Sequence, residues 1–166
     1  MKTVEDYFEL VYPDRRKKLI QYHNYFIKFF NEAKGSANKH QAWVGGYRNH
    51  LQQCLNIAEH LYELDFSFNF DSVILVLYFH DIEKMFKYSS LDVNLRKEVY
   101  LTETLFKIDG IRFSEEEMNA LTYIHGEGED YCANRVMNEL AAFCHSCDII
   151  SARCYHSKKQ ISKRYN

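Results

Sequence analysis

The sequence is poor in proline and glycine, the two residues that most often interrupt regular structure. It contains one Pro and six Gly in 166 residues, which excludes collagen-like and low-complexity chains. Apolar residues make up 46% of the chain and charged residues 27%, so an intrinsically disordered protein is also excluded. A domain usually contains about 100–200 residues. We therefore expect one compact globular domain.

An excess of charge of either sign is also missing. The chain has 21 Lys and Arg against 23 Asp and Glu, a formal net charge of −2. No overall positive field is available to recruit nucleic acid, so any phosphate binding must be local. The near-neutral charge favours a small substrate over a polymer such as nucleic acid, and it leaves the oligomeric state open.

Long apolar runs are absent as well. The most apolar segment, Val73 to Phe79, is far shorter than the roughly 20 residues that cross a bilayer. The first ten residues lack the basic start and apolar stretch of a secretory signal. The five cysteines are odd in number and lie mostly in helical patterns, which favours reduced thiols; Cys144 and Cys147 form a Cys-x-x-Cys pair without a second pair, a weak zinc signal. We expect a soluble cytoplasmic protein with no membrane partner.

Apolar residues recur at helical spacing along most of the chain. Leu19, Tyr22, Phe26 and Phe29 follow one another at intervals of three and four, which predicts a helix over residues 14–33. We expect further helices just before Pro13, from Gly46 to about 64, over 72–80 with Asp71 as its cap, around 101–108, from the capping box of Ser114 and Glu117 toward His125, and over 133–155.

The alternation of apolar and polar residues that marks strands does not extend over a useful length, although residues 73–77 alone are compatible with a buried strand. The sequence therefore predicts an all-α fold, a single-domain helical bundle. We expect residues 1–37 to form N-terminal helices packed on a core of residues 38–156. Residues 157–166, which include Lys158, Lys159, Lys163 and Arg164, are expected to form a basic tail.

Histidines and aspartates stand at the positions where a helical bundle can gather metal ligands. His50 lies inside one expected helix, the pair His80-Asp81 closes another, and His125 ends a third. His145 and Asp148 lie three residues apart on a fourth and so share a face. Asp148 sits in an apolar stretch, where a carboxylate requires a cation partner. Imidazole and carboxylate together suit divalent transition metals.

These residues occur in an order that resembles the HD-domain metal-dependent phosphohydrolases. That family has a histidine, a His-Asp pair and a distant aspartate, matched here by His50, His80-Asp81 and Asp148. The HDIEK stretch at 80–84 is similar to the family's HDIGK, and HQAWVGGYRNH at 40–50 resembles the HHAxxGGLLEH of HD proteins related to exoribonucleases. The stretches IHG at 124–126 and HSCD at 145–148 resemble that group's HHG and HxAD. The resemblance covers about residues 38–156.

The resemblance implies an all-α core and a resident divalent transition metal (Mn, Fe, Co, Ni or Zn). His50, His80, Asp81 and Asp148 would hold one ion. His125 and His145 would hold a second ion bridged by Asp81, or they would serve the substrate or proton transfer. Gln41 and Ile124 replace histidines of the family pattern, which leaves the choice between one ion and two open.

Other residues near these motifs are candidates for substrate binding and catalysis. Lys84 lies one turn beyond His80 and is a candidate to bind phosphate, as are Arg48 and, less strongly, Lys87; each is also compatible with a solvated surface. Trp43 is a candidate to stack on a base or to close the pocket, although a hydrophobic lid packed on the bundle suits it slightly better. His40, near it in the sequence, is a further candidate for substrate binding. Asp81, Lys84 and His125 are the candidate catalytic residues.

Three functions compete on this basis. The leading hypothesis is a phosphohydrolase that cleaves a phosphomonoester, phosphoanhydride or phosphodiester bond of a small nucleotide with a metal-activated water. A 3′–5′ exonuclease or RNA phosphodiesterase is suggested by the Gly45-Gly46 and His50 context, but the 37 residues before the core are too few for a nucleic-acid-binding domain. A catalytically silent nucleotide sensor is the third, and the complete set of metal ligands argues against it.

Overall fold

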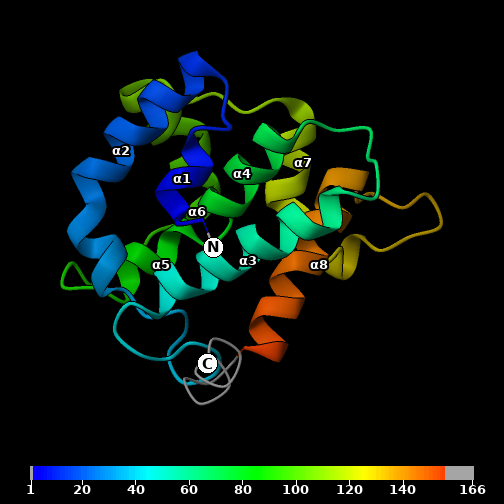
Figure 1. The fold of residues 1–166 in the computed structure, drawn as a ribbon. Helices are drawn as coiled ribbons and strands as arrows, with labels where there is room; N and C mark the ends of the chain where they lie inside the picture. The colour runs from blue at the N-terminus through cyan, green and yellow to red at the C-terminus, as the bar shows by residue number, and fades with distance from the viewer. Residues whose placement is uncertain (1, 156–166) are drawn as a thin grey trace.

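The computed structural model describes residues 2–155, which form helices and no strand (Figure 1). The predicted all-α fold is confirmed. The elements are α1 (Val4–Phe8), α2 (Pro13–Glu32), α3 (Gly46–Tyr62), α4 (Phe70–Phe79), α5 (Ile82–Lys87), α6 (Lys97–Val99), the π-helix η1 (Tyr100–Asp109), α7 (Glu115–Tyr123), the 3-10 turn η2 (Gly128–Asp130) and α8 (Glu139–Cys154). The basic tail predicted for 157–166 lies outside the described residues.

Helix α4 is the centre of the core. Every residue from Val73 to Phe79 is fully buried, so the ambiguous apolar run is a helix surrounded by other helices and not a strand. It packs against α3, α7 and α8. Its C-terminal cap is His80, which places the first residue of the His-Asp pair at the end of the most buried element.

The cap predicted at Asp71 is wrong. Asn69 occupies the N-cap position of α4, and Asp71 lies inside the first turn. Its carboxylate instead accepts a bond from Arg15 of α2, with Nη1 and Oδ2 3.3 Å apart. Asp71 is buried at the start of α4, and a buried carboxylate is stabilised by a cation such as Arg15.

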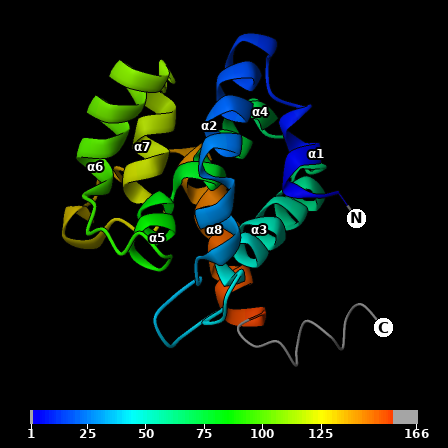
Figure 2. The same cartoon turned by 90° about the vertical axis from the view of Figure 1, so that its left-hand side faces the viewer.

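Helices α3 and α8 lie side by side and carry the two ends of the metal-ligand pattern. Helix α8 packs against both α3 and α7, and α1 and α2 pack on the other sides of α3 (Figures 1 and 2). Residues about a hundred positions apart in the chain, such as His50 and Asp148, therefore meet across one helix pair.

The segment between α2 and α3 folds back on itself before α3 begins. Gly45 has a φ of +78°, a conformation that glycine adopts without cost. A Cβ on Gly46 would lie 1.8 Å from the carbonyl oxygen of Gln41, so only glycine fits there. The tight fold carries His40 and Gln41 to the end of α8, where Gln41 Nε2 donates to the Tyr155 carbonyl at 3.2 Å.

The last helix begins six residues later than predicted, at Glu139 with Asn138 as its cap. The side chain of Glu127 is the reason. Its Oε1 accepts the backbone N–H groups of Val136 and Met137 at 2.9 and 3.0 Å, which holds that segment out of helical geometry. Glu127 therefore braces the loop that precedes α8.

Candidate metal centre

Five of the predicted side chains converge at one place in the bundle. His50 comes from α3, His80 and Asp81 lie between α4 and α5, His125 follows α7, and Asp148 comes from α8. His50, His80, Asp81 and Asp148 are buried, whereas the side chain of His125 is 47% exposed. The cluster is thus enclosed on three sides and open at His125.

Two nitrogens and two oxygens form the closed part of this cluster. Nε2 of His50 lies 3.1 Å from Asp148 Oδ1 and 3.6 Å from Asp81 Oδ2. Nε2 of His80 lies 3.2 Å from Asp81 Oδ2 and 3.8 Å from Asp148 Oδ1. Ligands held about 2.0–2.1 Å from one metal ion are roughly 3.0–3.4 Å from one another, so the four atoms are spaced nearly as ligands of a common ion.

The hydrogen bonds around His80 determine which of its nitrogens faces the cluster. Nδ1 lies 2.6 Å from the carbonyl oxygen of Leu77. Because a carbonyl only accepts, Nδ1 must carry the proton. Nε2 is then a lone pair facing a carboxylate oxygen, and it has no well-aligned hydrogen-bond partner among the described residues. Two acceptors this close require a cation, either a proton or a metal ion, between them.

Ser151 of α8 fixes the tautomer of His50, as the Leu77 carbonyl fixes that of His80. Its Nδ1 lies 2.9 Å from Ser151 Oγ, and that hydroxyl donates to Oε1 of Gln53 at 3.0 Å. Ser151 therefore accepts from Nδ1, which leaves Nε2 of His50 as the lone pair aimed at Asp148.

Gln41 completes this support. Its amide nitrogen donates to Gln53 Oε1 at 2.9 Å, and its Oε1 accepts from Nδ1 of His40 at 2.7 Å. Gln41, one of the two residues that depart from the resembled pattern, is fully buried and fixes the orientation of both His40 and the Gln53–Ser151 pair. Second-layer partners of this kind set the tautomer and basicity of metal-binding histidines.

The pKa values of the cluster reflect burial and mutual attraction. Burial lowers the pKa of His50 to about 4. Burial opposes ionisation of Asp81, but His80 and Lys84 outweigh it and hold the pKa of Asp81 well below its ordinary value. Burial likewise opposes ionisation of Asp148, and His50 and His80 lower its pKa. Both carboxylates are therefore ionised at neutral pH inside the protein.

His125 approaches the outer oxygens of the same carboxylates. Its Nε2 lies 3.5 Å from Asp81 Oδ1 and 3.8 Å from Asp148 Oδ2, whereas His50 and His80 face the other oxygen of each. This position suits a ligand of a second ion that shares the carboxylates, and it equally suits a group that holds a proton at the open side of the cluster.

His145 does not join the donor atoms that lie close enough together to share an ion. Its Nδ1 donates to the carbonyl of Ile124, the residue immediately before His125. The helical spacing does put His145 on the same side of α8 as Asp148, but its bond braces the turn that carries His125.

Lys84 and His40 lie at the cluster, as the sequence suggested. Lys84 forms an ion pair with Asp81 and remains partly exposed. The ring of His40 lies 5.1 Å from that of His50, centroid to centroid. Burial, and next the charge of Lys84, lower the pKa of His40, so this imidazole is neutral at neutral pH.

Arg48 and Trp43 are directed elsewhere. Arg48 lies two residues before His50, about 200° around α3, and binds Glu5 of α1 at 2.7 Å and Asn31 of α2 at 2.9 Å. Trp43 donates from Nε1 to Asn49 at 2.9 Å. Lys87 lies over the ring of Tyr88. None of these contacts is with a residue of the cluster.

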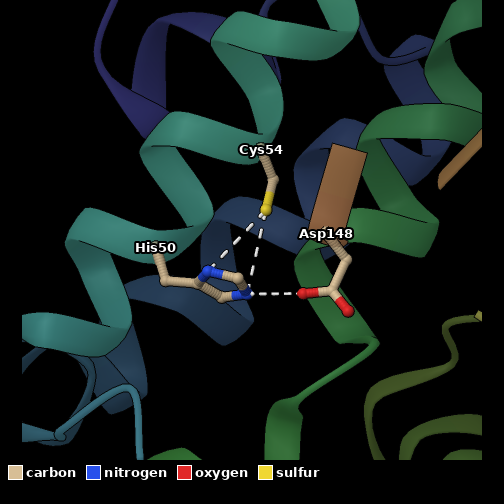
Figure 3. A group of neighbouring side chains, drawn as sticks. All are labelled: His50, Cys54 and Asp148. Carbon is tan, nitrogen blue, oxygen red and sulfur yellow. Dashed lines mark hydrogen bonds and ion pairs between the residues drawn. The ribbon is translucent and has the colours of Figure 1, made fainter. Parts of the chain in front are cut away.

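Cys54 is a neighbour of the cluster that the sequence reasoning missed. Its Sγ lies 3.8 Å from Nε2 and 3.9 Å from Nδ1 of His50 (Figure 3), and it belongs with His50 and Asp148 to one possible donor group. Burial raises the pKa of the thiol well above its ordinary value. Cys54 lies four residues after His50 and so on the same face of α3, a spacing from which its place beside His50 could have been predicted.

The donor set fits a divalent transition metal. Two ionised carboxylates face two imidazole nitrogens that can each offer a lone pair to a metal ion, and nitrogen-containing sites favour such ions over an all-oxygen magnesium site. Buried His and Asp groups that can hold a metal are therefore present.

The comparisons with known proteins found no relative of this chain. No protein-family model matches the chain, and no curated protein or solved structure matches it. Within residues 2–155, none of the helices is both long enough and apolar enough to cross a membrane.

Proposed function

We propose that this protein is a metal-dependent phosphohydrolase of the HD-domain type that acts on a small nucleotide. The observation that carries the proposal is the convergence of His50, His80, Asp81 and Asp148, in the order of the family pattern, on one buried point with mutually facing lone pairs. A bound divalent ion would supply Lewis acidity, withdrawing charge from the phosphoryl group and making water more acidic.

The residues around this point have separate roles in the proposal. Lys84, which is partly exposed beside Asp81, balances charge in the free site and binds a phosphate oxygen in the complex. His125 stands at the open side, within 4 Å of both carboxylates, and holds or passes a proton at Nε2. His40, which is neutral and half-buried against His50, limits the access of water from the other side.

The test is phosphate release from a panel of nucleotides in the presence of Mn²⁺, Co²⁺ or Mg²⁺. We expect turnover with at least one transition metal and loss of it in Asp81→Asn on the order of a thousandfold, because a metal-stabilised transition state is worth several kcal/mol. Asp14→Asn, an exposed aspartate at the start of α2, is the matched control and should keep wild-type turnover.

Wild-type turnover in Asp81→Asn at saturating metal would contradict the assignment. Hydrolysis of no nucleotide by the metal-loaded wild-type protein, with phosphodiester substrates followed by chromatography of their products because their cleavage frees no phosphate, would contradict the proposed activity itself.

A further inference from the structure

Lys97, the first residue of α6, reaches two backbone carbonyls that belong to different helices. Its Nζ donates to the carbonyl oxygens of His80 and Leu121, each at 3.1 Å. The lysine side chain is partly buried, and Figure 2 shows α6 and α7 on the same side of the molecule. One ammonium group thus joins α6 to the ends of α4 and α7.

Both carbonyls lie at the end of a helix, where the helix itself offers them no partner. His80 is the C-cap of α4, and Leu121 lies in the last turn of α7. The last carbonyls of a helix accept no bond within it, and they form the negative end of its dipole. A lysine beside such an end supplies both donors and positive charge. Lys97 therefore caps two helices at once.

Residues of the metal cluster follow each of these two helix ends. Asp81 comes directly after His80, and His125 follows Leu121 by little more than one turn. The rings of His80 and His125 lie 5.7 Å apart, centroid to centroid, and Nε2 of His125 lies 3.5 Å from Asp81 Oδ1. The separation of the two helix ends therefore sets how closely His125 approaches the His80-Asp81 pair.

Lys97 differs in its contacts from Lys84, another lysine near the cluster. Lys84 forms an ion pair with the side chain of Asp81, whereas Lys97 binds backbone carbonyls. The charge of Lys97 also acts on Glu83 of α5, whose Oε2 is buried and has no hydrogen-bond partner among the described residues. Because its bonds go to the backbone, Lys97 can hold the helix ends without competing with a metal ion for a ligand.

We propose that Lys97 is a positioning residue of the metal centre. It holds the end of α7 against the end of α4, and so fixes His125 relative to the His80-Asp81 pair, while it is not itself a ligand. The inference rests on the proposed function only in taking the cluster as the site of the metal ion.

The test measures metal binding, so that it does not depend on turnover. The affinity of the folded full-length protein for Co²⁺ is measured by competition with a metal-binding dye, and the absorption spectrum of the cobalt-loaded protein reports the geometry around the ion. Lys97→Met keeps the apolar part of the side chain and removes its donors. We expect it to lose at least about tenfold in affinity, the lower end of the effect of partners outside the ligand set, and to change the spectrum.

The conservative variant and a matched control separate positioning from a general effect on stability. Lys97→Arg should restore most of the affinity and the wild-type spectrum, because a guanidinium group also donates several N–H bonds. Lys18 likewise binds a carbonyl at a helix end, that of Gly110 at 2.7 Å, but Gly110 caps η1, whose end carries no residue of the cluster. Lys18→Met should therefore bind Co²⁺ as the wild type does. Urea denaturation of the metal-free proteins compares their stability.

The outcomes distinguish this inference from the proposed function. Wild-type affinity and spectrum in Lys97→Met, an equal loss in Lys18→Met, or a Lys97→Arg variant that binds Co²⁺ no better than Lys97→Met would overturn the inference, whatever the activity. A loss confined to Lys97→Met and reversed by Lys97→Arg supports it even if no nucleotide is hydrolysed, in which case only the proposed function fails.

Discussion

At the scale of single residues, the candidate metal centre depends on side chains that are not themselves candidate ligands. Ser151 Oγ accepts a hydrogen bond from Nδ1 of His50 and donates one to Oε1 of Gln53. This arrangement leaves Nε2 of His50 unprotonated and aimed at Asp148. The family pattern contains no such serine, so the resemblance alone could not identify it, but its position one turn after Asp148 on α8 was a usable signal.

Ser151→Ala should weaken metal binding without removing a ligand. Loss of the acceptor frees the ring of His50 to change tautomer, and loss of such partners typically costs about 10–100-fold in metal affinity. Competition with a metal-binding dye measures the effect. Ser146→Ala, on the same helix but exposed and bonded only to the Ala142 carbonyl, is the control; equal affinities in the two variants would argue against the positioning role.

Variants of His125 and His145 distinguish a site that holds one ion from a site that holds two. If Nε2 of His125 is a ligand of a second ion, His125→Ala should reduce the metal content from two ions per chain toward one, whereas a proton-holding role leaves the content unchanged and lowers turnover only. His145→Ala should act more weakly, because His145 braces the Ile124 carbonyl. Elemental analysis of both variants decides, and a larger loss of metal in His145→Ala would contradict this ordering.

At the scale of helices, local sequence predicted most elements and tertiary contacts decided the rest. The start of α2 at Pro13 and the capping box of Ser114 and Glu117 were readable because caps lie within one turn of the residues they serve. The late start of α8 was not, because the bonds that hold residues 136 and 137 come from Glu127. The residues of the segment itself give no sign that the carboxylate of Glu127 binds their backbone.

Arg15 joins three elements through buried carboxylates. It binds Asp71 of α4 at 3.3 Å and Glu117 of α7 at 2.7 Å, and Glu117 is 1% exposed. Arg15 is thus the cation that lets both carboxylates stay inside the bundle.

Arg15→Ala should destabilise the fold by about 2 kcal/mol, less than the loss of a fully buried pair because Arg15 retains partial exposure. Urea denaturation measures the change. Lys107→Ala, which breaks the exposed pair with Glu103, should have no measurable effect, and equal stability of the two variants would show that the buried network contributes little.

At the scale of the whole molecule, the fold brings ligands from distant parts of the chain to one point. The order of His50, His80, Asp81, His125 and Asp148 in the sequence predicted that they would meet, since five separate matches to one pattern are unlikely to be scattered in space. The roles assigned to Arg48 and Trp43 rested on proximity in the sequence alone. A turn of 200° around α3 sends Arg48 toward Glu5.

Acid should release the metal. Although burial opposes it, the charges of Asp81 and Asp148 raise the pKa of His80 above its ordinary value of 6.5, so the metal-free protein takes up a proton there before an ordinary histidine would. Proton and metal compete for the same lone pair. The metal-induced rise in Tm should therefore be complete at high pH and begin to shrink above pH 6.5 as the pH falls. A rise that stays constant well below that pH would contradict this linkage.

The most direct test of the account is the metal content of the folded protein. The full chain is stripped with chelator, reconstituted with Mn²⁺, Co²⁺ or Zn²⁺, freed of excess ion and measured by elemental analysis beside the double variant Asp81→Asn/Asp148→Asn. We predict at least one ion per chain in the wild type and nearly none in the variant, because Asp81 and Asp148 are the carboxylates that face the cluster histidines. Folded wild-type protein that retains almost no metal, or a variant that retains as much as the wild type, would contradict it.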